Sequence, residues 1–80
     1  MTNTALLEQL IAESGLKKSY LAKKANMSLA WFRACVVNKG EFREGQMDAI
    51  AKELGIEDPA LFMAVFFAQS GALNAPNPNT

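Results

Sequence analysis

Apolar residues recur at spacings of three and four along most of the chain, which is the period of an amphipathic helix. The pattern predicts five helices, at about residues 4–14, 18–25, 29–37, 44–54 and 59–69. No stretch alternates between apolar and polar residues as a half-buried strand would. We therefore predict an all-α fold.

Residues suited to helix ends separate these segments. Gly15 and Gly55 follow the first and fourth helices, and glycine takes the left-handed conformation of a helix end without steric cost. Residues 38–40 (Asn-Lys-Gly) follow the third helix and include two residues suited to a positive φ angle. Asp58 and Pro59 are typical of a helix start, because aspartate caps and proline fits the first helical position.

Residues 18–28 predict two helices joined by a tight turn. Asn26 follows the second helix, and asparagine is among the best non-glycine residues for a left-handed turn position. Met27 is expected to point inward, and Ser28 suits the N-cap of the third helix. So short a turn makes two helices cross steeply, which is a helix-turn-helix arrangement.

Composition limits the broad class of protein. Eighty residues fit one domain, and half of them are apolar, which is enough for a core. No apolar run approaches the ~20 residues that a membrane span needs, so no membrane association is expected. Residues 71–80 contain two prolines and no charge, so we predict a helix-turn-helix domain over 1–70 and a disordered tail over 71–80.

The single cysteine and the absence of histidine argue against an enzyme. One cysteine, Cys35, excludes an internal disulfide and favours a reducing cytoplasm. It falls on the expected core side of its helix, where a thiol is inert. Without histidine and without metal-ligand spacing, we expect no catalytic residue, no metal, no cofactor and no small-molecule substrate.

The formal net charge is zero, which argues mildly against nucleic-acid binding. The charges are unevenly distributed, however. Residues 1–43 have seven basic and three acidic side chains, a net +4, whereas residues 44–80 have one basic and five acidic, a net −4. Ordinary surface solvation explains this distribution, and so does a protein with one half facing DNA and the other facing away.

Several short patterns occur in the order and spacing of one known family. They are the Leu21-Ala22 pair, Asn26 in the place of a family glycine, Ser28, the 38–40 string, and the run Ile-Ala-Lys-Glu-Leu-Gly-Ile at 50–56. Together they resemble the Cro/cI-type helix-turn-helix (xenobiotic-response-element) family of phage, prophage and bacterial regulators, over roughly residues 4–68. The resemblance implies a five-helix lambda-repressor-like DNA-binding domain.

The resemblance also implies where DNA would lie. The third helix would enter the major groove with its first residues facing base edges. The residues expected at DNA are Lys17, Lys18, Ser28, Leu29, Ala30, Trp31, Arg33, Ala34, Asn38, Lys39 and Arg43. Leu29, Ala30 and Ala34 depart from the family's usual polar residues and have no side-chain hydrogen-bonding groups. Arg33 is therefore the one strong base reader, and we predict weak or shape-dependent specificity with a substantial phosphate contribution.

The fifth helix is apolar nearly all round, more than one core face can absorb. Exposed clusters of this kind usually mark a partner surface, and symmetric homodimers are the commonest solution. We predict a homodimer through Phe62, Met63, Phe66 and Phe67. The alternative is that these residues close the base of the core against the first helix.

The sequence as a whole predicts a repressor-like transcriptional regulator that binds double-stranded DNA sequence-specifically. Two alternatives stay open. One is a five-helix bundle with no role at DNA. The other is a protein-interaction module that docks on another regulator, which the apolar Leu29, Ala30 and Ala34 would favour.

Overall fold

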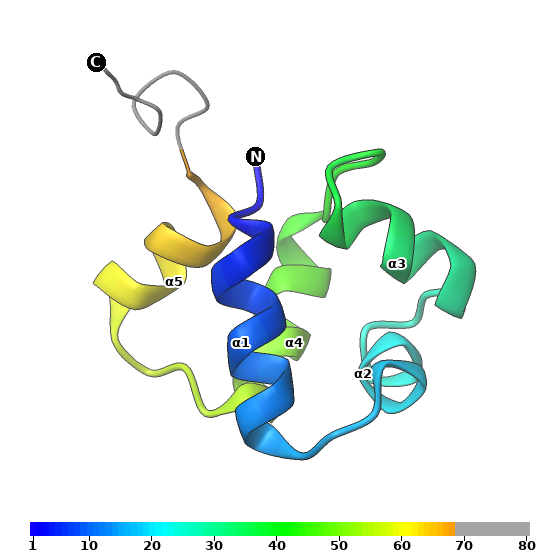
Figure 1. Cartoon of the computed structure of the whole chain (residues 1–80), viewed down its shortest axis with the longest axis horizontal. Coiled ribbons are helices and arrows are strands. Elements are labelled where there is room, and N and C mark those ends of the chain that lie inside the picture. The colour runs from blue at the N-terminus through cyan, green and yellow to red at the C-terminus, as the bar shows by residue number, and fades with distance from the viewer. Residues whose placement is uncertain (69–80) are drawn as a thin grey trace.

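In the computed structural model, which describes residues 1–68, the chain forms five helices and no strand within that range. They are α1 (Thr4–Ser14), α2 (Lys18–Lys24), α3 (Leu29–Val36), α4 (Glu44–Leu54) and α5 (Pro59–Phe66) (Figure 1). The predicted all-α fold is confirmed. The fifth helix ends at Phe66 rather than near residue 69, and the predicted tail at 71–80 lies outside the described residues. None of the helices within residues 1–68 has the length and apolar character to cross a bilayer.

The backbone changes direction at four positions with positive φ. Gly15 and Gly55 each have φ 73° at the ends of α1 and α4, as predicted. Asn26 and Asn38, with φ 58° and 66°, take the left-handed conformation that the sequence also predicts. Gly40 does not have a positive φ, so the prediction for that residue is wrong and its small size must serve another purpose.

Side chains cap the helices that begin after these turns. The Oγ of Ser28 accepts a hydrogen bond from the Trp31 backbone N–H at 3.1 Å, and Oδ1 of Asp58 accepts one from the Ala60 N–H at 2.9 Å. Each cap satisfies a backbone donor that has no partner inside its helix. The predicted starts of α3 and α5 are therefore confirmed.

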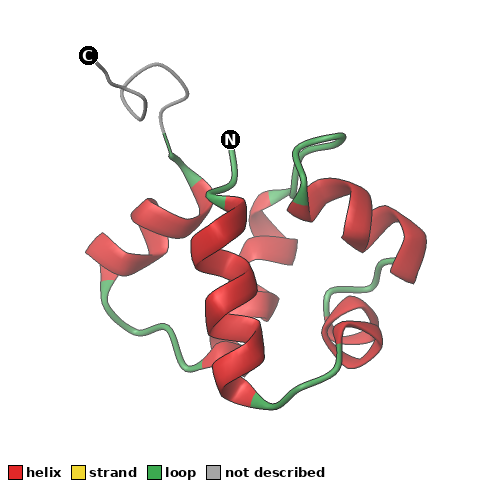
Figure 2. Ribbon diagram, viewed as in Figure 1, coloured by secondary structure: helices red, strands yellow, loops and turns green. Residues whose placement is uncertain are grey.

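The helices surround one apolar core. Figures 1 and 2 show α1 and α4 in the centre of the molecule, α5 on one side and the α2–α3 pair on the other. Phe42, in the loop between α3 and α4, packs edge-on against Phe32 and Phe66, with ring centroids 5.8 Å apart in both pairs. Phe42 thus joins the two sides of the molecule. The largest fully buried side chains are those of Phe32, Leu7, Leu21, Ile50, Val36, Val65 and Cys35.

The first residues of the chain lie along the end of α5. The backbone N–H of Asn3 donates to the carbonyl of Val65 at 2.8 Å, and the N–H of Ala68 donates to the carbonyl of Met1 at 2.8 Å. Asn3 also caps α1 with its side chain. The segment that precedes α1 is therefore fixed by both the end of α5 and the start of α1.

Candidate nucleic-acid interface

Residues 25–28 join α2 to α3 and hold the start of α3 beside α2. The N–H of Met27 donates to the carbonyl of Ala22 at 2.8 Å, which closes the end of α2, and Asn26 then reverses the chain. The Ser28 cap begins the next helix directly. As a result, the N-terminal end of α3 lies at the edge of the molecule, away from α1 and α5 (Figure 1).

One side of α3 is buried and the other is open. Phe32, Cys35 and Val36 are buried, as their spacing predicts. Ala30 and Arg33 are exposed, and so is Val37, which follows the last residue of α3. Leu29 and Ala34 are half-buried. The open side therefore offers mainly small apolar surface and one charged group.

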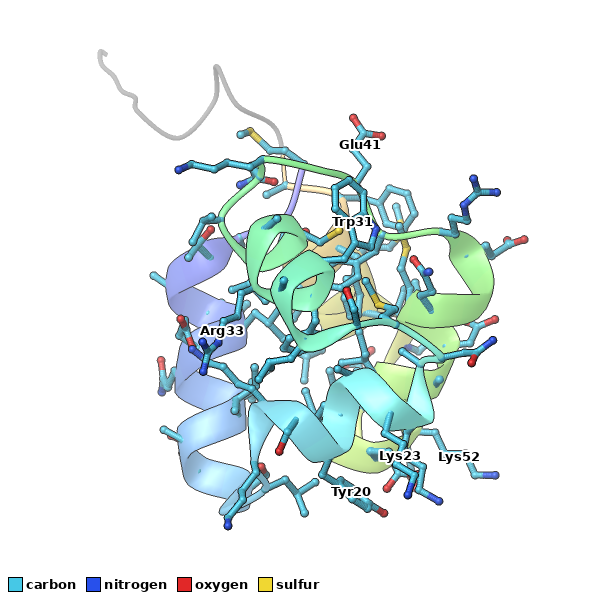
Figure 3. All side chains as sticks on the ribbon, turned by 90° about the vertical axis from the view of Figure 1, so that its right-hand side faces the viewer. Tyr20, Lys23, Trp31, Arg33, Glu41 and Lys52 are labelled. Carbon is cyan, nitrogen blue, oxygen red and sulfur yellow. The ribbon has the colours of Figure 1, made fainter. Side chains whose placement is uncertain are left out.

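Arg33 and Trp31 leave α3 on different sides (Figure 3). Arg33 extends on the side of α3 nearer α1. Lys18–Glu8 is the one ion pair within residues 1–68, so the Arg33 guanidinium has no carboxylate partner in that range. Trp31 points toward the loop that follows α3 and lies near Glu41, and 47% of its surface is exposed. Of these two side chains, only Arg33 has several hydrogen-bond donors to offer a ligand.

Lys18 is not a free cation. Its Nζ lies 2.9 Å from each carboxylate oxygen of Glu8 on α1. The predicted contact of Lys18 with DNA stays a prediction, and in the protein alone this charge is already compensated by an acidic neighbour. The pair is about one third exposed at the lysine side, and surface pairs of this kind stabilise a fold weakly.

Asn38 is also engaged within the protein. Its Oδ1 accepts a hydrogen bond from the Thr2 N–H at 2.8 Å, and its Nδ2 donates to the Thr2 carbonyl at 2.9 Å. Both polar atoms of the amide thus bind the segment before α1. Its predicted role at DNA stays a prediction, and within the protein Asn38 ties the loop after α3 to the start of the chain.

Trp31 covers Gly40 in the same loop. A Cβ atom at Gly40 would lie 2.5 Å from Cη2 of the Trp31 indole, closer than two carbon atoms can approach. Glycine is therefore favoured here for space and not for φ, since a side chain at this position would have to displace the indole. Lys39, between Asn38 and Gly40, is exposed, and its backbone N–H donates to the carbonyl of Ala34 at 2.8 Å. Its side chain therefore extends from a backbone that is held by the hydrogen bonds of Asn38 on one side and by the Trp31–Gly40 contact on the other.

Lys17 and Arg43 occupy the N-cap positions of α2 and α4, and both are exposed. Neither has a carboxylate partner within the described part of the chain. Gln46 accepts a hydrogen bond from the backbone N–H of Arg43 at 2.8 Å, which fixes the backbone and leaves the guanidinium outside the cap. Arg43 and Lys24 line one open groove of about 430 Å³.

A polar link between α2 and α4 was not foreseen from the sequence. The hydroxyl of Tyr20 donates a hydrogen bond to Glu53 at 2.9 Å, which raises the pKa of Tyr20 because the carboxylate stabilises the protonated phenol. Lys24 lies 5.5 Å from the centre of the Tyr20 ring. Tyr20 and Lys23 lie well away from Arg33 in Figure 3, so Lys23 does not form one cluster with Arg33.

The chain matches no known protein-family model, no curated protein and no solved structure. The role of the α3 region must therefore be inferred from its own residues. Those are an open helix side, a guanidinium without a carboxylate partner in residues 1–68, and exposed cations on the segments before α2 and after α3.

The apolar residues predicted at a dimer interface divide into two groups. Phe66 is 2% exposed and packs against Phe42, so it is a core residue and its assignment to an interface is wrong. Phe62 is half-buried, with its ring centroid 5.0 Å from that of Phe66. Met63 and Phe67 are 53% and 47% exposed. An apolar surface thus remains on α5, smaller than the sequence predicts.

Cys35 lies in the core, as predicted, and is completely buried. Burial raises the pKa of its thiol, because the apolar surroundings disfavour the thiolate. A thiol in this state is a poor nucleophile. Within residues 1–68, no group of three histidine, cysteine or acidic side chains could hold a metal ion.

Proposed function

We propose that this protein binds duplex DNA through the open side of α3 and acts as a sequence-specific, repressor-like transcriptional regulator of the lambda-repressor-like helix-turn-helix type. The observation that carries the proposal is the exposed Arg33 guanidinium, which has no carboxylate partner within residues 1–68 and stands on a helix at the edge of the molecule. A helix in this position fits the major groove, where arginine can bind O6 and N7 of guanine together.

Phosphate contacts would come from three exposed cations, Lys17, Lys39 and Arg43. Each phosphate contact releases counterions, so three contacts give a slope of log K against log salt of about −2.7. Affinity would then fall roughly 40-fold between 50 and 200 mM salt. This is a shallow dependence for a DNA-binding protein, and it agrees with the zero net charge of the chain.

The first experiment measures binding to a labelled duplex of random sequence across a salt series. The wild-type protein should show the slope given above. Lys52→Ala is the matched control, because Lys52 lies on α4 beside the groove that Phe62 and Glu57 line, outside the proposed interface. The control should keep the wild-type slope. Binding that does not respond to salt, or no binding at low salt, would overturn the proposal.

A second experiment tests the role of Arg33. Selection of preferred duplexes from a random pool should give a site with at least one required guanine. An arginine contact to guanine discriminates by about 1–3 kcal/mol. Arg33→Ala should therefore remove the preference at that position while the salt slope of random duplex stays unchanged. Lys52→Ala should select the same site as the wild type.

A protein-docking function is the second candidate, and one observation favours it. Trp31 and Val37 are 47% and 48% exposed at the two ends of α3, so this helix presents apolar surface as well as charge. Such a surface suits an apolar groove on another regulator. If the wild-type protein has no affinity for any duplex at low salt, docking becomes the better interpretation of the same helix.

We also propose that two copies associate through the exposed part of α5, around Met63 and Phe67, with Phe62 at its edge. Linking two α3 helices would raise affinity for a two-part site, because the second half binds as an intramolecular step. This compensates for the small number of base-reading groups on one copy.

A further inference from the structure

We propose that Trp31 and Asn38 are positioning residues for phosphate binding: together they fix residues 37–41, so that Lys39 meets the DNA backbone from a preset place. The inference rests on the proposed function. It adds to that function the two residues that hold Lys39 in place for its phosphate contact. It assigns to both side chains a role other than touching DNA.

Trp31 holds the loop from the α3 side. The indole lies against Gly40, so closely that a Cβ there would be 2.5–3.1 Å from three of its ring atoms. Figure 3 shows the ring turned toward the loop and not along the open side with Arg33. About half of the Trp31 surface is nevertheless exposed.

Asn38 holds the loop from the opposite direction. Its two hydrogen bonds to Thr2 connect the loop to the segment before α1, and Thr2 is itself 7% exposed. That segment is in turn hydrogen-bonded to the end of α5 through Asn3 and Val65. The loop is therefore anchored to two parts of the molecule besides α3.

Lys39 lies between these two anchors. Its backbone N–H is bound to Ala34, and that of Asn38 is bound to Cys35 at 3.1 Å, so the backbone around Lys39 is fixed before any ligand arrives. A cation on a fixed backbone loses less conformational freedom on binding than one on a mobile loop. Preorganisation thus explains why a chain with few cations would hold the loop around Lys39 through both Trp31 and Asn38.

The test compares the salt slopes of variants on random duplex. Lys39→Ala should reduce the slope by about 0.9, which corresponds to roughly eightfold weaker binding at 0.1 M salt. Trp31→Ala and Asn38→Gly should each remove most of the same amount, because a loop without either anchor no longer holds Lys39 at the phosphate. Because all three act through one contact, adding Lys39→Ala to either variant should weaken binding no further.

Tyr20→Phe is the matched control, since it breaks a side-chain link between α2 and α4 and leaves the loop untouched. It should keep the wild-type slope. Trp31→Phe, which retains a smaller ring, serves if Trp31→Ala unfolds, and it should lie between wild type and Lys39→Ala. If the wild type binds and Trp31→Ala and Asn38→Gly keep its slope, or if their losses add to that of Lys39→Ala, this proposal is wrong. A wild type that binds no duplex overturns the proposed function and this inference together.

Discussion

The side-chain amide of Asn38 and the backbone of Thr2 form a closed pair of hydrogen bonds, 2.8 and 2.9 Å long, between residues 36 positions apart in sequence. Asn38 has a φ angle of 66°, which asparagine tolerates better than other residues with a Cβ. One side chain thus supports a backbone turn and a long-range contact.

These two roles of Asn38 can be separated by substitution. Asn38→Gly keeps the left-handed turn and loses two hydrogen bonds, so the free energy of unfolding should fall by about 1–2 kcal/mol. Asn38→Ala loses the same bonds and adds steric strain, so it should cost about 1–2 kcal/mol more. Urea denaturation at constant slope m measures both values. Equal stabilities of the two variants would contradict this account of the turn.

Gly40→Ala tests the contact with Trp31. The new methyl group would meet the indole, but the exposed ring has room to move, so the expected loss of stability is about 1–2 kcal/mol. The displaced indole should become more exposed, which shifts its fluorescence emission to longer wavelength. In a Trp31→Ala background the same substitution should cost nothing, because the obstacle is gone. An equal cost in both backgrounds would show that the indole is not what excludes a Cβ.

Glu41 is an acidic residue in the loop proposed to meet phosphate, and it is exposed. If the loop lies against DNA, this carboxylate opposes binding. Glu41→Gln should therefore tighten binding to random duplex by about two- to fivefold, in line with about 0.4–1 kcal/mol for exposed charge interactions. Glu57→Gln, in the groove between α4 and α5, changes the net charge equally and should have less effect. Equal gains from both would mean that only net charge matters.

Local rules predicted the parts of the fold that depend on neighbouring residues. Asn26, Ser28 and Gly15 each act on backbone groups within a few residues, through φ preference or capping, so their roles could be read from the sequence. The buried side of α3 followed from helical spacing in the same way.

The contacts that the sequence did not predict depend on how the helices pack, which spacing does not encode. Lys18 was expected at DNA with no partner in the protein foreseen, yet α1 places Glu8 beside it, and the partner of Asn38 is Thr2, just before α1. Gly40 illustrates a subtler error, because its need for glycine comes from a neighbouring ring and not from its own φ. Contacts of this kind join residues on different elements, so they follow from how the helices pack and not from the sequence around each residue.

Because Cys35 is buried, its thiol should react slowly with thiol reagents in the folded protein. In the folded protein a thiol reagent should react only as fast as the core opens, whereas the urea-unfolded chain should react at once.

The raised pKa of Cys35 also predicts that stability depends on pH. The unfolded chain releases this proton near the ordinary thiol pKa of about 8.5, while the folded protein retains it. Its contribution to stability is therefore complete below that pH and declines as pH rises above it. Cys35→Ala should lack this part of the decline, and rapid labelling of the native protein would contradict the buried position.

Phe66 and Phe67 are adjacent in sequence but should respond to substitution in opposite ways. Phe66 is in the core beside Phe42, so Phe66→Ala should lower the free energy of unfolding by about 3–5 kcal/mol. Phe67 is half-exposed, so Phe67→Glu should change stability much less and act on self-association instead. Sedimentation over a concentration series should give a dimer for the wild type and a monomer for Phe67→Glu. Val37→Glu is the matched control, because Val37 is equally exposed but follows α3, and it should remain dimeric. A wild type that stays monomeric at high concentration would exclude a dimer formed through α5.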